Sequence, residues 1–407
     1  MTSRRRPDSA APRRRGVWAR LGSLLFWTLE APIAGTVAVG LAAAWLPPRP
    51  FWWAQIVAVG LPYAAWGLAA WTLVVAVTRH RRVALVHFAL LGAVLWRAAP
   101  LAPEPAAPDV LAADDVLRLV SFNVPEQGPS REALGDSMVA FVRATEPHLL
   151  ALQDAWIFAP SPLPRHRADR NIQLAAVERA LPYRARLPDR IEGVQAWRRT
   201  GTGVSLLVRD GVDVRAETAL PVGQLAQDVT SLATRTEVTW QGRTFALYNT
   251  HLRSFGADKP WLNPALRRGA LRERLRAALP YLRLYRSVYA ARGDEAAALA
   301  RIVAEDSLPA VVVGDFNSTP DNWSAWRLRT AGVRRADAQR VRGLGWGRTF
   351  PARRPLVRID AVYADPALDV LGAETAPVGF SDHRPVRVWL RWRDRPVPAP
   401  ADTVSTE

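Results

Sequence analysis

The sequence contains no cysteine, and its 407 residues include a single lysine, Lys259. Without cysteine the chain cannot form disulfide bonds, zinc–thiolate sites or iron–sulfur clusters, and it has no cysteine nucleophile. The shortage of lysine means that almost all of the basic side chains are arginines. The chain is long enough for two or three domains of about 150 residues. Its hydrophobic fraction of 49% and charged fraction of 22% are close to the averages of globular proteins.

The net charge of +17 is spread unevenly along the chain. Residues 1–100 hold twelve arginines against only Asp8 and Glu30, which gives this part a net charge of +10. Residues 101–407 carry only +7. Most of the basic charge therefore belongs to the N-terminal quarter, which argues against a broad nucleic-acid-binding surface on the rest of the protein.

Long apolar stretches occupy the N-terminal quarter, at about 21–46, 51–77 and 83–101. A helix needs roughly 20 apolar residues to cross the core of a bilayer, so the first two stretches are long enough. The third is shorter and is interrupted by His87 and Arg97, so an interfacial or buried helix is the alternative for it. The first stretch exceeds the apolar region of about 7–15 residues typical of a cleaved signal peptide. We predict three transmembrane helices within residues 17–101.

The arginines predict how these helices are oriented. Most of those in residues 1–100 precede the first helix or lie between the second and third, and only Arg49 lies between the first and second. Because positively charged loops stay in the cytoplasm, the N-terminus is predicted to be cytoplasmic and the chain beyond residue 101 to lie outside the cytoplasm. If the third stretch does not span, the rest of the chain is cytoplasmic. Glu30 is costly within a bilayer, and His87 is its expected partner.

The flanks of the membrane region have little apolar patterning. Residues 1–16 are polar and basic and are predicted to be a disordered arm. Residues 102–114 are rich in alanine and proline, which is typical of a short, stiff linker. Residues 394–407 are predicted to be a disordered tail. The remaining segment, 115–393, is expected to form one domain.

Short apolar runs typical of strands occur in this domain at 117–122, 149–152, 203–208, 244–248, 310–313, 359–363 and 386–390. Helical patterns lie between them, at 131–145 and over 263–306. We expect the second of these to form two helices broken near Gly293. The irregular alternation of strands and helices favours an α/β fold with mixed sheets over a strict βαβ repeat.

Polar residues able to carry chemistry follow, flank or, for Asp360, lie within these runs: Asn123, Asp154, Asn249, His251, Asp315, Asn317, Asp360, Asp382 and His383. Strand ends are where an α/β scaffold presents its site, so we expect these side chains to meet. Each residue alone is also compatible with a turn, a helix cap or a surface pair. Their joint occurrence indicates a site.

The residue types indicate metal-assisted hydrolysis. Aspartate and asparagine oxygens are hard ligands that suit Mg²⁺ or Ca²⁺, and Asp154 is a candidate for direct coordination. Asp315 is a candidate to position or activate water, and Asn123 and Asn317 to bind phosphate oxygens. A pair between Asp360 and His383 would hold the imidazole in one tautomer and raise its basicity.

The order of these motifs resembles that of the endonuclease/exonuclease/phosphatase superfamily, over about residues 115–393. The matching pieces are Ser-Phe-Asn-Val at 121–124, Leu-Gln-Asp at 152–154, Asn-Thr-His-Leu at 249–252, Gly-Asp-Phe-Asn-Ser at 314–318, Arg-Ile-Asp at 358–360 and Ser-Asp-His-Arg-Pro-Val at 381–386. The resemblance implies a four-layer α/β/β/α sandwich of two mixed sheets, here preceded by transmembrane helices. It also implies divalent-metal-dependent hydrolysis of phosphoesters.

The same resemblance implies a role for each site residue. The metal group is Asp154, Asn123 and Asp382, and the catalytic group is Asp315, Asn317, His383, Asp360, His251 and Asn249. His383 and Asp315 share the role of base, while Asn123, Asn317 and Arg253 are the expected substrate contacts. The metal carboxylate of the family is usually a glutamate, and the shorter Asp154 departs from that pattern. Glu126, just after Asn123, is a possible compensation.

An additional segment separates His251 from Gly314. It contains Arg253 and, further on, Arg267, Arg268, Arg272, Arg274 and Arg276. Two alternatives remain for it: a solvated helix face, or a cap that recognises a phosphate-bearing substrate or rests on anionic head groups. Trp346, Thr349 and Phe350 are candidates to line the cleft, although core packing is the simpler role for Phe350.

Together these features predict a phosphodiesterase or phosphomonoesterase held in a membrane by several helices, with its catalytic domain outside the cytoplasm. The expected cofactor is Mg²⁺, with Mn²⁺ or Ca²⁺ as alternatives. The expected partners are the lipid bilayer and a phosphate ester, which is a phospholipid, a lipid-linked phosphate, a nucleic acid or a small molecule; no protein partner is inferred. The alternatives are a nuclease outside the cytoplasm and a catalytically weak binding module.

Overall fold

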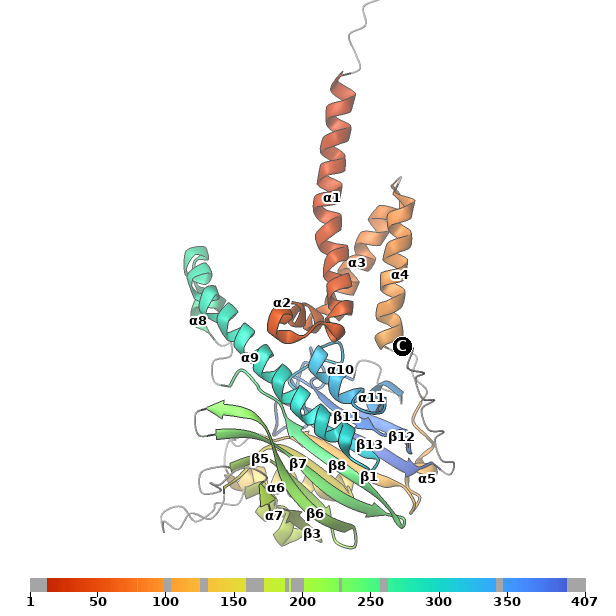
Figure 1. The fold of residues 1–407 in the computed structure, drawn as a ribbon, viewed down its shortest axis with the longest axis vertical. Coiled ribbons are helices and arrows are strands. Elements are labelled where there is room, and N and C mark those ends of the chain that lie inside the picture. Colours follow the sequence, from red (N-terminus) through yellow and green to blue (C-terminus); the bar gives the residue numbers. More distant parts are fainter. Residues whose placement is uncertain are drawn as a thin grey trace, which may run out of the picture.

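The computed structural model describes residues 13–78, 80–98, 104–124, 131–158, 172–186, 190–191, 201–226, 229–256, 263–341 and 347–393. Two β-sheets face each other, helices cover them, and a further group of helices projects from one side (Figure 1). Of the predicted arm, residues 13–16 belong to the first helix and are not an irregular segment. Residues 1–12, the predicted tail at 394–407, Glu126 and Trp346 lie outside the described residues.

The first sheet has the strand order β12-β13-β1-β2-β5-β3. Its strands are β1 (Leu117–Asn123), β2 (Leu149–Phe158), β3 (Tyr183–Arg186), β5 (Gly201–Arg209), β12 (Leu368–Thr375) and β13 (Val386–Trp392). Strands β1 and β2 are parallel and place Asn123 beside Gln153. The remaining pairs are antiparallel, so the sheet is mixed.

The second sheet has the strand order β10-β11-β9-β8-β7-β6-β4. Its strands are β4 (Arg190–Ile191), β6 (Asp213–Ala226), β7 (Val229–Trp240), β8 (Arg243–His251), β9 (Ala310–Asp315), β10 (Ala336–Asp337) and β11 (Asp360–Ala364). Strands β8 and β9 are parallel and place His251 beside Asp315. All seven apolar runs predicted as strands are strands in the structure.

Three hydrophobic clusters hold four layers together. Between the sheets, Leu119 and Leu149 from the first belong to one cluster with Phe245 and Val311 from the second. On the outer face of the first sheet, helix α6 (Arg131–Thr145) packs through Met138, and helix α7 (Ile172–Ala180) packs beside it. On the outer face of the second sheet lie α9 (Leu271–Glu305) and α10 (Trp323–Arg329). The predicted α/β/β/α sandwich is therefore present.

Helix α9 corrects one prediction, because it continues through Gly293 without a break. A side chain at this position would meet the ring of Pro48, since a Cβ atom there would lie 2.9 Å from Pro48 Cγ. The glycine thus lets another helix approach closely, at the modest cost that glycine carries within a helix.

The helix that carries Pro48 belongs to a group of N-terminal helices. They are α1 (Arg13–Ala42), the short 3₁₀ helix η1 (Ala43–Trp45), α2 (Pro48–Val59), α3 (Leu61–Ala76) and α4 (Arg81–Ala98). The stretch predicted as the second transmembrane helix is two helices, α2 and α3, with a bend of 62° between them at Gly60. Within the described residues, length and apolar composition qualify residues 20–45 as a candidate span, and α2 with α3 as a second if the bent pair counts as one. Helix α4 does not reach that criterion.

A buried polar network joins α1, α3 and α4. Glu30 Oε1 lies 2.8 Å from His87 Nε2, the partner expected from the sequence. Trp71 Nε1 donates to Glu30 Oε2 at 2.8 Å, and Thr72 Oγ1 lies 3.0 Å from His87 Nδ1. Each of these buried groups has a partner, which offsets the cost of removing it from water.

The predicted linker is packed against the sandwich. Helix α5 (Pro108–Leu111) lies within it, and Ala106 N donates a hydrogen bond to Leu371 O at 2.8 Å. Val110 and Leu111 contact a cluster that includes Trp389. The described part of the linker therefore lies against the domain, because its small apolar side chains find apolar surface on the edge of the first sheet.

His148, just before β2, gives the fold an acid-sensitive contact. Its Nδ1 accepts a hydrogen bond from Arg118 N at 3.0 Å, and its ring lies 4.5 Å from that of Trp240. Burial, with Arg118 and Arg209 nearby, lowers the pKa of His148 from 6.5 to about 4. Between these two pKa values, the imidazole of His148 is protonated in the unfolded chain and neutral in the folded chain.

This contribution to stability is complete above pH 6.5 and is lost as the pH falls towards 4. We expect acidification from pH 7 to pH 4.5 to cost about 1–2 kcal/mol at this site, a value reduced from the full shift because the ring is partly exposed. The check is Tm against pH for the full-length protein and for His148→Gln, whose curve should fall less steeply. Parallel curves would contradict this assignment.

Candidate active site

Four strands bring the site together. In the first sheet β1 ends at Asn123, beside Gln153 within β2, and in the second sheet β8 and β9 end beside each other. Gly314, just before the end of β9, allows this approach, because a Cβ atom there would lie 1.9 Å from Thr250 O. Antiparallel pairing then sets Asp360 of β11 beside Asp315 of β9.

Asp315 is the centre of the site and is almost fully buried. Its carboxylate accepts hydrogen bonds from Asn123 Nδ2 at 2.9 Å and from Asn317 N at 2.8 Å. Two imidazoles approach the same carboxylate oxygen, Oδ2: the Nε2 atoms of His251 and His383 lie 3.6 and 3.8 Å away. Burial and the neighbouring Asp360 raise the pKa of Asp315, against the opposing effect of the two histidines.

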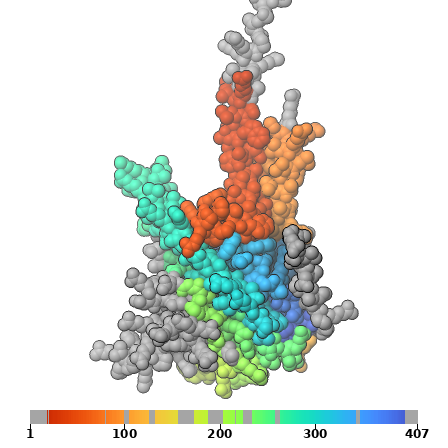
Figure 2. All heavy atoms as spheres, viewed as in Figure 1, coloured from red at the N-terminus to blue at the C-terminus, as the bar shows by residue number. Residues whose placement is uncertain are grey.

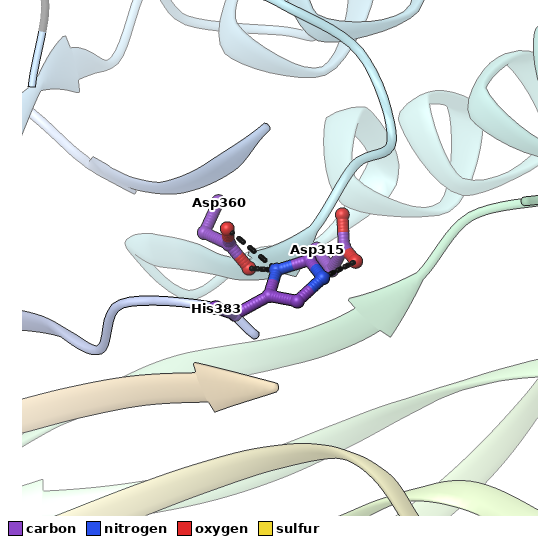
Figure 3. A group of neighbouring side chains, drawn as sticks. All are labelled: Asp315, Asp360 and His383. Atoms are coloured by element: carbon purple, nitrogen blue, oxygen red, sulfur yellow. Dashed lines mark hydrogen bonds and ion pairs between the residues drawn. The ribbon is translucent and has the colours of Figure 1, made fainter. Parts of the chain in front are cut away.

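His383 and Asp360 form the predicted pair (Figure 3). His383 Nδ1 lies 3.0 and 3.1 Å from the two carboxylate oxygens of Asp360, and its Nε2 faces Asp315. The ring of Phe350 lies 4.8 Å from the imidazole, and Thr349 Oγ1 accepts hydrogen bonds from the backbone of β11 at Asp360. Burial disfavours the charged imidazole, but Asp360 and Asp315 outweigh burial and raise the pKa of His383 to about 10.

His251 and Asp154 form a second pair. His251 Nδ1 lies 3.2 Å from Asp154 Oδ1. Burial opposes the charge on His251, but Asp154 and Asp315 raise its pKa to about 9. Burial likewise opposes ionisation of Asp154, yet His251 and a hydrogen bond with Asn123 lower its pKa. The side chain of Asp154 is 40% exposed, so this pair forms an accessible rim around the buried Asp315.

A model of the endonuclease/exonuclease/phosphatase family matches residues 120–383, which is more than half of the chain. The chain belongs to this family. Members of the family hydrolyse phosphoester bonds and depend on a divalent metal. The matched segment includes every site residue described above. No curated protein matches the chain.

Several solved structures have a similar fold. An endonuclease/exonuclease/phosphatase from Bacteroides vulgatus is 17% identical, with 68% of this chain and 99% of that chain covered and a TM-score of 0.42. The catalytic domain of human Nocturnin, with bound sulfate, is 15% identical, with 69% and 96% covered and a TM-score of 0.46. A mannosyl-6-phosphatase from Bacteroides thetaiotaomicron is 17% identical, with 68% and 100% covered and a TM-score of 0.43.

The donor atoms of this family member fit a divalent cation in two ways. Asp315, Asp360 and His383 each offer a ligand atom, and these atoms lie within 4.8 Å of one another. In that group, however, His383 and Asp360 already bind each other. Asp154 is likewise paired with His251, but its side chain is 40% exposed and lies beside Asn123, and hard oxygen donors of this kind suit Mg²⁺. We therefore take Asp154 as the main candidate ligand.

Three predicted site residues lie differently from expectation. Asn249 is buried, accepts a hydrogen bond from Gln153 Nε2 at 2.8 Å and donates to the backbone oxygens of Leu152 and Ser205. Its amide therefore joins the two sheets, and the catalytic role expected for Asn249 stays a prediction. The other two residues lie at the margin of the site.

Arg253 and Asp382 are the other two predicted site residues that lie differently from expectation. The backbone N of Arg253 donates to Glu295 Oε2 at 2.7 Å, and its side chain lies 3.5 Å from Glu295 Oε1. Arg253 is thus paired with Glu295, and its role as a substrate contact stays a prediction. The side chain of Asp382 is exposed, and the structure gives it no close contact with Asp154 or Asn123 among the described residues. Its negative charge contributes to the raised pKa of His383.

One charged residue near the site escaped the sequence analysis. Arg292 of α9 is only 1% exposed, and its Nε donates to Arg253 O at 2.8 Å. It packs against the rings of Tyr289 and Phe255, at 4.8 and 5.8 Å from their centres. Arginine is rarely buried without a partner. The sequence pattern that could have identified Arg292 is an arginine between the apolar helix positions Val288 and Ala296.

Proposed function

We propose that this family member is a Mg²⁺-dependent hydrolase of phospholipids or lipid-linked phosphates, anchored in a membrane with its catalytic domain outside the cytoplasm. The observation that carries the proposal is that segments adjoining the catalytic residues are bound by α2 and α3. A site built on these helices faces the bilayer that they enter. A substrate held in the same bilayer can then reach the site without leaving the membrane surface.

The first of these segments follows Asp315 and Asn317. Asn322, five residues further on, donates from Nδ2 to Gln55 O of α2 at 2.8 Å, and Trp323 N donates to Gln55 Oε1 at 3.0 Å. Gln55 is almost fully buried in this contact. The loop that carries Asn317 is thereby tied to α2.

The second segment is the loop beside His383. Phe350, whose ring lies against that imidazole, bridges to Val357 across the loop. The neighbouring Leu356 O accepts a hydrogen bond from the hydroxyl of Tyr63 in α3, at 2.7 Å. Ion pairs between Arg97 and Asp321 and between Arg49 and Asp294 add to the same interface.

The arrangement of the helices supports the orientation. Helices α1, α3 and α4 project from the same side of the sandwich (Figure 1). The arginine-rich start of α1 and the Arg81–Arg82 start of α4 lie at the ends far from the catalytic domain. Positive charge at the far ends favours a cytoplasmic location for them and a location across the membrane for the domain. At about 1.5 Å per residue, the 18 residues of α4 extend about 27 Å, close to the thickness of the bilayer core.

The site geometry suggests how these residues divide the work. Asp315 is placed to orient or deprotonate the attacking water, and Asn123 and Asn317 hold its carboxylate in position. His383, held by Asp360, directs Nε2 into the site, where it can donate to a phosphate oxygen. His251 offers a second donor on the rim. A divalent cation held by Asp154 and Asn123 would neutralise charge on the phosphate.

The test is hydrolysis by the full-length protein reconstituted with Mg²⁺ into vesicles of phosphatidylcholine and phosphatidylglycerol. We expect release of water-soluble or diglyceride products from these lipids, at a rate that changes little with salt. Linear double-stranded DNA serves as the competing substrate. Faster cleavage of DNA, with a rate that falls steeply with salt, would contradict the lipid substrate and indicate a nuclease. Turnover of neither substrate, with the protein folded, would favour a binding module.

A further inference from the structure

The first half of α9 projects from the catalytic domain and touches it near its end, where the Tyr285 ring lies 4.8 Å from the Phe255 ring. The buried residues of α9 begin at Val288, and neither α8 (Pro264–Arg268) nor the part of α9 before Val288 contains a buried residue. We call residues 264–287 the basic arm. Figures 1 and 2 show it as a blue-green projection on the side of the sandwich from which α1, α3 and α4 extend. Residues 264–287 therefore bury no side chain in the hydrophobic core.

The basic arm nevertheless has an apolar face. Leu271, Leu275, Leu279 and Leu282 recur at intervals of three or four residues, which places them on one side of the helix. These leucines are 74%, 62%, 63% and 46% exposed. A row of exposed leucines is unusual on a soluble surface and marks a site of contact with a membrane or another apolar surface.

The charge of the basic arm indicates whether this face contacts a membrane or another apolar surface. It contains seven arginines and one acidic residue, Glu273. Glu273 is engaged at the start of the helix, where its Oε2 accepts from Ala270 N at 2.9 Å. Within the described part of the chain, no ion pair involves the arginines of the arm: Arg267, Arg268, Arg272, Arg274, Arg276, Arg283 and Arg286. Leucines flanked by so much positive charge match a lipid surface with anionic head groups.

We propose that the basic arm lies in the head-group layer of the membrane that holds the N-terminal helices, as a second and separate lipid contact. The inference rests on the proposed membrane anchoring. The arm projects on the same side of the sandwich as α1, α3 and α4, and these helices also carry exposed apolar side chains such as Leu24 and Leu85. The arm is thus a lipid-binding element of the domain rather than a lid over the site.

The arm also has a physical connection to the site. Helix α9 is continuous from the arm to Arg292 and Glu295. These two residues hold the segment after His251, because both bond to the backbone of Arg253. Docking the arm therefore sets the height and tilt of the site above the bilayer, which matters for a substrate embedded in lipid and not for one in solution.

The absence of cysteine allows a direct test, because single-cysteine variants can be labelled without background. We would label Leu275→Cys in the arm, Leu24→Cys in α1 and Glu132→Cys on α6 with the fluorophore NBD. The full-length protein is then placed in vesicles of phosphatidylcholine and phosphatidylglycerol that carry nitroxide-labelled lipid. We expect strong quenching at positions 24 and 275 and none at 132, with weaker quenching at 275 when phosphatidylglycerol is omitted.

Each contrary result has a distinct meaning. Quenching at 24 without quenching at 275 overturns the docking of the arm and leaves the anchoring intact. No quenching at either position overturns the anchoring and, with it, the proposal. A label at 275 that is shielded from water and yet is not quenched by nitroxide lipid indicates a protein partner or a second copy of the chain, which also overturns the proposal.

Activity provides a second readout. The double variant Leu275→Glu/Leu279→Glu places acidic groups on the apolar face, and Ser287→Glu adds one on another side of the helix. We expect the double variant to lose several-fold in the hydrolysis of vesicle lipid and to keep its rate on soluble bis-p-nitrophenyl phosphate. The Ser287 variant should keep both rates. Equal loss on both substrates would contradict a role of the arm in lipid docking.

Discussion

Replacing His383 by alanine is expected to lower kcat for the hydrolysis of bis-p-nitrophenyl phosphate by about 10²- to 10⁴-fold, the usual contribution of one positioned acid–base group. The reason is geometric. Asp360 holds the imidazole at 3.0 Å, and its free Nε2 faces the Asp315 carboxylate in the centre of the site. The measurement is steady-state kinetics of the detergent-solubilised protein with saturating Mg²⁺.

This substitution also leaves the buried Asp360 without its partner, so stability must be measured with activity. Tm of the variant shows whether the loss of rate reflects unfolding. The matched control is His148→Gln. His148 is partly buried and lies just before Leu149, where β2 begins. We expect this variant to keep full activity at pH 7.5. A folded His383→Ala protein with wild-type kcat would contradict the assigned role.

The second large effect concerns the metal. A chelator is expected to abolish the activity, and Asp154→Ala to raise the Mg²⁺ concentration needed for half-maximal rate by about 100-fold or more, since losing even a supporting contact of a metal ligand costs about 10- to 100-fold in metal affinity. Asp154→Glu should retain activation by Mg²⁺, because glutamate restores the carboxylate usual in the family. Rate against Mg²⁺ concentration, with Mn²⁺ and Ca²⁺ as alternatives, makes the comparison.

Asp382→Asn separates the two candidate metal ligands predicted from the sequence. The exposed side chain of Asp382 leads us to expect a smaller change in the Mg²⁺ requirement than Asp154→Ala produces. An unchanged requirement in Asp154→Ala would move the metal to the buried group of Asp315, Asp360 and His383. If Asp382→Asn raises the Mg²⁺ requirement as much as Asp154→Ala does, Asp382 is a metal ligand, as the sequence predicted.

The strands that sequence patterns identified are those buried on both faces. The run at Val311–Val313 is continuous and apolar, because β9 lies between a sheet and a helical layer. The longest strands, β6 and β7, were not identified, although they form an extended antiparallel hairpin. Polar and apolar residues are interspersed in both strands, and β7 contains four threonines, which is a weaker signal for a half-buried surface. Gln241-Gly242, which follows β7, marked a turn that was overlooked.

The candidate site was predicted more completely than its surroundings. Asn123, Asp315 and His383 meet as expected, since Asn123 and Asp315 end their strands and His383 lies shortly before β13. The packing of Asn249 between the sheets and the hold of Glu295 on Arg253 depend on contacts across long separations in the chain. No local pattern indicates such contacts. Arg292 was missed for the same reason.

The sequence by itself determined the family, the residues of the site and the apolar character of the N-terminal helices, because motif order and local hydropathy are properties of neighbouring residues. Only the tertiary structure decided that α2 turns away from α3 to bind the domain, that α9 continues through Gly293, and that half of α9 stands exposed. These outcomes depend on which distant surfaces fit together. Pro48 against Gly293 is such a fit, and burial of that kind is invisible in either segment alone.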